Sequence, residues 1–319
     1  MATSGNDAAP IDFTTGPSGG NLAVAWFAGS HPRRHVAAPP LQVHAFDEHT
    51  YILRQSKDVH YEAPFLYLFL GNERALLIDT GATPEPERLP LRATVDDLIG
   101  AWLARHPRRR YPLTVAHSHG HGDHVAADGQ FVGRPDTEVV AHGAEAVARF
   151  FRLDAWPEGV ATYDLGGRVL EVLACPGHQA ASIAVFDPWS GFLLTGDTVC
   201  RGRLYVREPA EFVRSIGRLA NFAALRPVRF VMGAHIEMSK RPGRDYPIGS
   251  TYQPDEPPLP LPPAVLGELS ERLQTVGTRP GAHVFDDYAV WIGPCPGAMA
   301  GQALRAILYG TMLRAGLAR

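Results

Sequence analysis

Apolar positions after residue 41 fall into short runs typical of β-strands and longer stretches with helical spacing. The clearest short runs, 65–70 and 75–79, are joined through Gly71 and Asn72 and predict a β-hairpin. Further short runs predict strands near 113–117, 137–141, 169–174, 182–187, 191–195, 228–232 and 283–292.

Helical spacing separates these runs. Segment 94–106 places five apolar side chains on one helical face: Val95, Leu98, Ile99, Trp102 and Leu103. Thr94 and Asp97 have the spacing of a capping box, with aspartate in place of glutamate or glutamine. Other helices are predicted near 143–152, 209–225, 264–276 and from about residue 300. Early hairpins followed by mixed strands and helices predict an α/β fold in which helices cover sheets.

Two segments lack this periodicity. Residues 1–40 are rich in glycine, proline and alanine, and we expect them to form an N-terminal arm. Residues 236–263 contain the stretch QPDEPPLPLPP, and we expect them to form a long surface loop. That loop belongs to one domain, which we expect to span residues 41–319.

Composition narrows the class of function. Hydrophobic residues make up 45% and charged residues 20% of the 319 positions, as in an ordinary globular protein with a large core. The net charge of −3 and the lack of clustered lysine and arginine disfavour a nucleic-acid partner. The three cysteines have no CxxC spacing, which favours a reducing compartment. The N-terminus lacks a signal-peptide pattern and no apolar run reaches the roughly 18 residues of a membrane span, so we expect a cytoplasmic protein without membrane contact.

Four histidines and an aspartate fall within the eight residues from His117 to His124. Alternate residues of an extended chain point the same way, so His119 and His121 can face one centre. Asp123 and His124 follow, where the chain can turn into a helix near Val125. Imidazole and carboxylate suit zinc, and also iron or manganese, so this stretch predicts a metal site.

The stretch SHGHGDH resembles the His-x-His-x-Asp-His signature of the metallo-β-lactamase-fold hydrolases. The resemblance runs in register from about residue 41 to 292. Four other stretches match the family pattern: LLIDTG (76–81), CPGHQAAS (175–182), LLTGDTV (193–199) and VMGAHIE (231–237). It implies a four-layer αββα sandwich and a site for two metal ions, most simply two Zn²⁺, with iron or manganese as alternatives.

Carried over by position, the resemblance implies three protein ligands for each ion and one shared carboxylate. The first ion would be held by His119, His121 and His178, and the second by Asp123, His124 and His235. Asp197 would bridge the two ions, while Asp79 and His117 would support the ligands from behind.

The reaction that the resemblance implies is hydrolysis of an ester, thioester or lactone carbonyl by a metal-bound hydroxide, with Asp123 and Asp197 as catalytic residues. Hydroxyacylglutathione hydrolases share this ligand pattern, although their glutathione-binding segment has no match in this chain. Alternatives are a mono-iron persulfide dioxygenase-like oxidoreductase, whose three iron ligands would also be present, and a β-lactam hydrolase. The expected partner is a small-molecule substrate, and the pattern indicates no particular oligomeric state.

Basic and aromatic residues beyond the ligand segments are candidates for substrate binding. If their segment is extended, one face carries Arg201, Arg203, Tyr205 and Arg207, and these residues, Arg203 and Tyr205 first, could meet an anionic group. Lys240, Arg241 and Arg244 begin the aperiodic loop after His235, which we expect to act as a lid over the metals.

Overall fold

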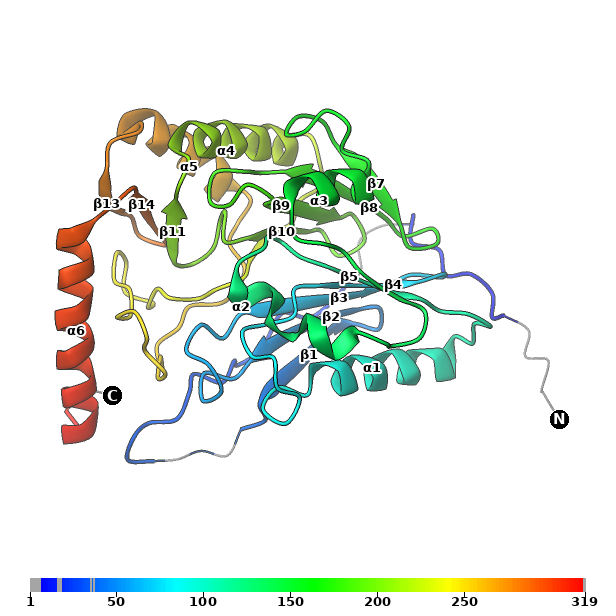
Figure 1. The fold of residues 1–319 in the computed structure, drawn as a ribbon, viewed down its shortest axis with the longest axis horizontal. Coiled ribbons are helices and arrows are strands. Elements are labelled where there is room, and N and C mark those ends of the chain that lie inside the picture. The colour runs from blue at the N-terminus through cyan, green and yellow to red at the C-terminus, as the bar shows by residue number, and fades with distance from the viewer. Residues whose placement is uncertain (1–6, 16–18, 35, 37, 318–319) are drawn as a thin grey trace.

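Two β-sheets lie face to face in the computed structural model, and helices cover their outer faces, giving four layers in the order αββα (Figure 1). The structure describes residues 7–15, 19–34, 36 and 38–317. The fold is therefore the four-layer sandwich that the sequence predicts. Among the described residues, no helix is both long enough and apolar enough to cross a membrane.

The first sheet has six strands in chain order: β1 (Leu41–Asp47), β2 (Thr50–Gln55), β3 (Phe65–Leu70), β4 (Ala75–Ile78), β5 (Leu113–Ala116) and β6 (Thr137–Val139). Its first four strands are antiparallel neighbours, which confirms the hairpin predicted between β3 and β4. Strands β4, β5 and β6 are parallel, because α1 (Leu91–Arg105) and the elements after β5 return the chain to the same end.

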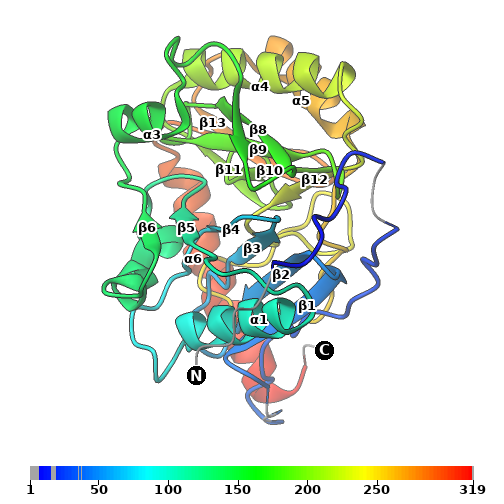
Figure 2. The same cartoon turned by 90° about the vertical axis from the view of Figure 1, so that its right-hand side faces the viewer.

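The second sheet has five strands in the order β12 (Phe230–Gly233), β10 (Phe192–Gly196), β9 (Ile183–Asp187), β8 (Val169–Ala174) and β7 (Ala161–Asp164). On its outer face lie α4 (Pro209–Ala224) and α5 (Ala264–Val276), at the top of Figure 1, and α1 lies beneath the first sheet. Small helical elements follow β5 and β6, namely α2 (Gly122–Val125), η1 (Ala126–Phe131) and α3 (Ala144–Phe151). Figure 2 shows α3 at the side of the sandwich.

Apolar runs without alternation form the central strands because both faces of each sheet are buried. In β3, Phe65, Tyr67 and Phe69 join the core between the two sheets. The intervening Leu66 and Leu68 pack toward α1 in a separate core that includes Trp102 and Val115. A third core lies between the second sheet and the helices α4 and α5.

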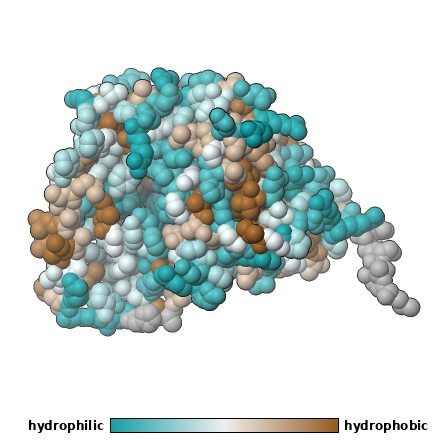
Figure 3. Space-filling view, in the orientation of Figure 1, coloured by the Kyte–Doolittle hydropathy of each residue, from teal (hydrophilic) through white to brown (hydrophobic). Residues whose placement is uncertain are grey.

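A small third sheet carries the chain end. Its strands are β11 (Arg203–Val206), β14 (Ala289–Ile292) and β13 (Gly281–Val284). Helix α6 (Pro296–Ala315) then stands at one end of the sandwich (Figure 1) and is tied to it by a hydrogen bond from Tyr309 Oη to the Tyr252 carbonyl oxygen (2.9 Å). Five of its apolar side chains are exposed, namely Met299, Leu304, Ile307, Leu308 and Met312, and apolar surface is visible at that end of the molecule in Figure 3.

The N-terminal segment touches the sandwich at several described positions. Phe13 is buried and packs edge-on against Trp189, and Leu22 and Trp26 pack on the core between the sheets. The Ile11 backbone N–H donates to Asn72 Oδ1 (2.8 Å). We continue to propose a boundary near residue 40, where regular strand structure begins.

Three local predictions were wrong. Helix α1 begins at Leu91, one turn before the expected capping box, because Leu91 is buried and Thr94 Oγ1 donates to the Pro90 carbonyl oxygen (2.9 Å). The strand expected over 283–292 is a hairpin of β13 and β14, whose turn is closed by the Phe285 N–H donating to the Tyr288 carbonyl oxygen (2.9 Å). The turn contains two aspartates, at 286–287, a residue type that is common in turns. In addition, the helix expected near Val125 begins at Gly122.

Candidate metal centre

The predicted ligands gather where strand ends from both sheets meet. Strands β8 and β10 are antiparallel to β9 and β12 is parallel to β10, so β8, β10 and β12 end at the same edge. His178, Asp197 and His235 follow those three ends. The loop after β5 reaches the same edge from the first sheet, fixed by the Ile183 N–H donating to the Ser118 carbonyl oxygen (2.9 Å).

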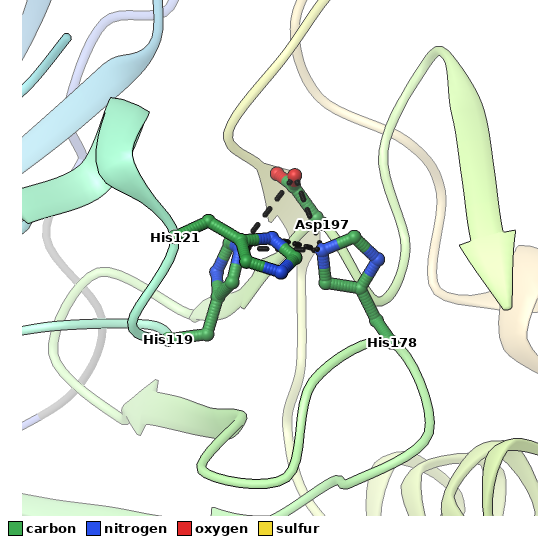
Figure 4. Close-up of side chains that lie close together, drawn as sticks. All are labelled: His119, His121, His178 and Asp197. Carbon is green, nitrogen blue, oxygen red and sulfur yellow. Dashed lines mark hydrogen bonds and ion pairs between the residues drawn. The ribbon is translucent and has the colours of Figure 1, made fainter. Parts of the chain in front are cut away.

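Seven predicted residues form two groups that share Asp197, within the part of the chain that the structure describes. The first group comprises His119, His121, His178 and Asp197, whose side chains point toward one another (Figure 4). The second group comprises Asp123, His124, Asp197 and His235. In each group the candidate ligand atoms lie within 4.8 Å of one another.

Three ring nitrogens converge in the first group. His119 Nε2 lies 2.9 Å from His121 Nδ1 and 3.2 Å from His178 Nε2, and the last two atoms are 3.0 Å apart. Asp197 Oδ2 lies 3.8 Å from His119 Nε2 and 3.6 Å from His178 Nε2. The three imidazoles therefore surround one point, with a carboxylate oxygen at its side.

The second group has the same spacing around the other oxygen of Asp197. Asp197 Oδ1 lies 3.5 Å from His124 Nε2 and 3.3 Å from His235 Nε2. Asp123 Oδ2 lies 3.3 Å and 3.2 Å from the same two nitrogens. Asp197 thus directs one oxygen to each group.

Contacts behind the groups fix the ring orientations. His178 Nδ1 donates to the Tyr205 carbonyl oxygen (2.7 Å), His235 Nδ1 to the Glu62 carbonyl oxygen (3.1 Å) and His124 Nδ1 to Asp79 Oδ2 (2.9 Å). With the proton held on Nδ1, each ring directs the lone pair of Nε2 into its group.

Asp79 and Gly196 shape the backbone around the ligands. Asp79 has a left-handed φ of 69°, and its carboxylate accepts from the Ser118 N–H (2.7 Å) and Ser118 Oγ (2.8 Å) as well as from His124. Gly196, with φ of 51°, lets Asp197 approach, because a Cβ there would lie 2.7 Å from Ser118 Cβ. We expect Asp79 to orient the ligand loop.

Charge differs between the two groups. Burial lowers the pKa of His119 well below its ordinary value, and burial also lowers the pKa of His121 and of His178, so the first group presents neutral rings. Burial alone would lower the pKa of His235, but the Asp197 and Asp123 carboxylates outweigh it and raise this pKa to about 9. A cation entering the second group would therefore displace protons.

A cavity of about 160 Å³ opens onto both groups. Its lining combines five residues of the two groups with neighbours from the third sheet, from the loops after β10, β11 and β12 and from the loop before β3: Glu62, His121, Asp123, His178, Asp197, Cys200, Arg203, Tyr205, Arg207, His235 and Glu237. Of the predicted substrate-binding residues, this lining includes Arg203 and Tyr205.

Arg203 lies at the cavity with its guanidinium already engaged. It pairs with Glu237, with Asp245 Oδ2 (2.7 Å) and with the Tyr246 carbonyl oxygen (2.9 Å). Its Nε donates to Tyr205 Oη (3.1 Å), and burial raises the pKa of Tyr205 to about 12. Arg203 therefore holds the protonated phenol of Tyr205 in place. Its guanidinium is already paired and is not available to bind an anionic group of a substrate.

Lys240, Arg241 and Arg244 lie away from this cavity, contrary to the expectation that they cover the metals. All three are exposed. Arg241 and Arg244 line a separate cavity against α6, and Lys240 lies 3.9 Å from Asp255 Oδ1. The loop folds back instead, because Met238 and Tyr246 are buried.

Sequence reasoning missed two acidic neighbours of the cavity, Glu62 and Glu237, and placed Arg207 on one extended face with Arg203 and Tyr205. Arg207 is exposed, and its guanidinium has no hydrogen bond or ion pair with any described residue. The odd-numbered spacing of Arg203, Tyr205 and Arg207 was the available signal, but spacing does not reveal which arginine is already paired.

Residues 63–235 match the family model described as the metallo-beta-lactamase superfamily. The chain is 29% identical over 186 residues to a hydroxyacylglutathione hydrolase of Anaeromyxobacter dehalogenans, a match that covers 57% of this chain and 61% of that protein. A hydroxyacylglutathione hydrolase of Cyanothece sp. is 29% identical over 196 residues, covering 54% of this chain and 76% of that protein. The chain thus spans less than two thirds of the first of these relatives.

Solved structures resemble the chain at lower identity. A metallo-beta-lactamase from Pontibacter korlensis is 20% identical, with a TM-score of 0.47 over 73% of this chain and 99% of that one. The DIM-1 metallo-beta-lactamase is 14% identical, with a TM-score of 0.49 over 76% of this chain and 100% of that one.

Proposed function

This chain belongs to the metallo-β-lactamase superfamily, and we propose that it is a dinuclear metal-dependent hydrolase of anionic thioesters. The observation that carries the proposal is the pair of groups around Asp197, with one carboxylate oxygen toward each. The relatives named hydroxyacylglutathione hydrolase favour a thioester over other carbonyl substrates.

The donor set fits two divalent ions, most simply zinc. Each group offers imidazole nitrogens and carboxylate oxygens, which suit zinc as well as iron or manganese. Asp197 Oδ1 is buried and has no hydrogen-bond partner among the described residues, a costly arrangement for a carboxylate unless a cation lies against it. His119, His121 and His178 would hold one ion, Asp123, His124 and His235 the other, and Asp197 both.

When bound, two such ions would lower the pKa of a shared water and polarise the substrate carbonyl. The chain's own residues supply the surroundings. Asp79, Tyr205 and Glu62 hold the ligand rings through the Nδ1 contacts described above. The Tyr205 phenol, protonated because burial raises its pKa to about 12, can donate a hydrogen bond to a substrate oxygen.

Arg207 carries the preference for an anionic substrate. It lies on the cavity lining and its guanidinium is unpaired within the described residues. The other arginine of the lining, Arg203, is neutralised by Glu237 and Asp245. A carboxylate on the substrate would therefore form its ion pair with the planar guanidinium of Arg207.

Metal content and substrate range test the function together. Protein purified without added metal should contain about two transition-metal ions per chain and hydrolyse thioesters in preference to lactones and β-lactams. Elemental analysis and a panel of these substrates provide the measurement. One tightly held iron without a second metal would instead indicate the persulfide dioxygenase, and turnover of β-lactams alone would indicate a lactamase.

Replacing Arg207 by alanine should raise KM about tenfold for a carboxylate-bearing thioester and leave kcat nearly unchanged, because Arg207 contributes binding and takes no part in bond cleavage. A neutral thioester of similar size should show little change. Arg244→Ala is the matched control, since Arg244 is exposed and lies outside the lining. Equal effects on both substrates would contradict the role of Arg207.

A further inference from the structure

A second cluster of imidazoles and a carboxylate lies beside the seven residues and shares none of them. It comprises His117, Asp128 and His142, whose candidate ligand atoms lie within 4.8 Å of one another. His117 Nε2 is 2.8 Å from Asp128 Oδ1, and His142 Nε2 is 2.7 Å from Asp128 Oδ2. The two rings stand nearly perpendicular, at 88°, with centroids 4.7 Å apart.

The cluster is anchored on one side and open on the other. The side chains of His117 and Asp128 are 4% and 18% exposed, whereas that of His142 is 40% exposed. Thr80 Oγ1 donates to Asp128 Oδ1 (2.8 Å) and fixes the carboxylate from behind. An ion can therefore arrive past His142 and meet two donors that are already in position.

We propose that His117, Asp128 and His142 form a third metal site, which takes a divalent transition-metal ion such as Zn²⁺. Two imidazole Nε2 atoms and a carboxylate oxygen are a donor set that such ions prefer, and water can complete the coordination. For each Nε2 to bind the ion, its ring carries its proton on Nδ1, so the ion takes the place of the two Nε2 contacts to Asp128 and both rings stay neutral. The site uses none of the seven residues proposed to hold the two ions of the hydrolase, although the family resemblance gave His117 a supporting place behind them.

An ion at this site would stiffen the loop that carries four of the seven residues around Asp197. His117 lies two positions before His119 in the chain. The N–H of Thr80, which holds Asp128, also donates to the His124 carbonyl oxygen (2.7 Å). Opposite, a Cβ at Gly120 would lie 3.0 Å from His142 Cβ, so His142 packs directly on the loop.

Zinc binding by the full chain tests the site. Wild type and His142→Ala are equilibrated with buffered free Zn²⁺, and bound zinc is measured by elemental analysis across the buffer series. Wild type should bind about one more equivalent than His142→Ala, and that ion should be the weaker one because His142 is partly exposed. His106→Ala is the matched control, since His106 contacts one carboxylate, Glu48 (3.0 Å), and belongs to none of the three clusters.

The outcome is separable from the proposed hydrolase, because the readout is the difference between wild type and His142→Ala rather than activity. Equal zinc binding by these two proteins would overturn the third site, even if both hold two ions at the hydrolase groups. Thermal unfolding of both proteins in chelator should give the same midpoint, and zinc should then raise the midpoint more in wild type. A midpoint that zinc raises equally in both would also count against the site.

Discussion

Asp197→Ala should reduce thioester hydrolysis by about 10³- to 10⁵-fold, because Asp197 alone faces both groups of ligands. Without it, His235 and His124 lose the shared carboxylate at 3.3 Å and 3.5 Å, and the first group loses its only carboxylate. We therefore expect weaker binding at both positions and a fall in kcat. Steady-state kinetics and the metal content of the variant are the two measurements.

The matched control for this prediction is Asp255→Ala. Asp255 is an aspartate whose side chain is 47% exposed, and it lies outside the cavity, near Lys240. Its loss should leave both hydrolysis and metal content unchanged. If Asp197→Ala kept activity within about tenfold of wild type, a carboxylate shared by two catalytic ions would be untenable.

The ligand-bearing stretch could be predicted from sequence because its information is local. His119, His121, Asp123 and His124 fall within six positions, so spacing alone brings them together. His178 and His235 are different, since each follows a separate strand of the second sheet. Their placement depends on the common direction of β8, β10 and β12, which spacing does not encode, and it came from the family resemblance.

For the fold too, features encoded locally could be predicted, and features that depend on tertiary contacts could not. Strands such as β3 and β9 are buried on both faces, so they can be recognised in the sequence as continuous apolar runs. Strand β7 has four residues of alternating partial exposure and gives too short a pattern to recognise. Helix and loop ends depended on burial, as at Leu91, which no local capping rule foresees.

Charged side chains of the site were the least predictable part. Arg203 looks like an anion-binding residue in the sequence, yet Glu237 and Asp245, which lie 34 and 42 positions later, neutralise it. Lys240, Arg241 and Arg244 follow a ligand segment closely and still lie outside the cavity, because the buried Met238 before them and Tyr246 after them turn the loop back. Sequence gives the sign of a charge, whereas its partner comes from the tertiary fold.

A buried ion pair outside the site supports the sheets, and its loss should have the largest effect on stability. Arg168 and Asp187 are 1% and 0% exposed at their side chains and are joined by Arg168 Nη2 donating to Asp187 Oδ2 (2.5 Å). The same guanidinium donates to the His49 carbonyl oxygen (2.7 Å) and to Thr50 Oγ1 (2.7 Å). It therefore links the start of β8 and the end of β9 to the first sheet.

Arg168→Met should lower the free energy of unfolding by about 3–5 kcal/mol, because it removes the cation beside the buried Asp187 carboxylate and the hydrogen bonds of the guanidinium to the first sheet. Urea unfolding followed by circular dichroism measures the change. The double variant Arg168→Met with Asp187→Leu should recover part of this loss, since no unpaired charge then remains in the core. Arg214→Met, which removes an arginine from an exposed pair with Glu211, should leave the urea midpoint unchanged. A midpoint for Arg168→Met equal to that of Arg214→Met would mean that hydrogen bonds from Ser190 Oγ and the Ser190 N–H suffice to hold the buried carboxylate.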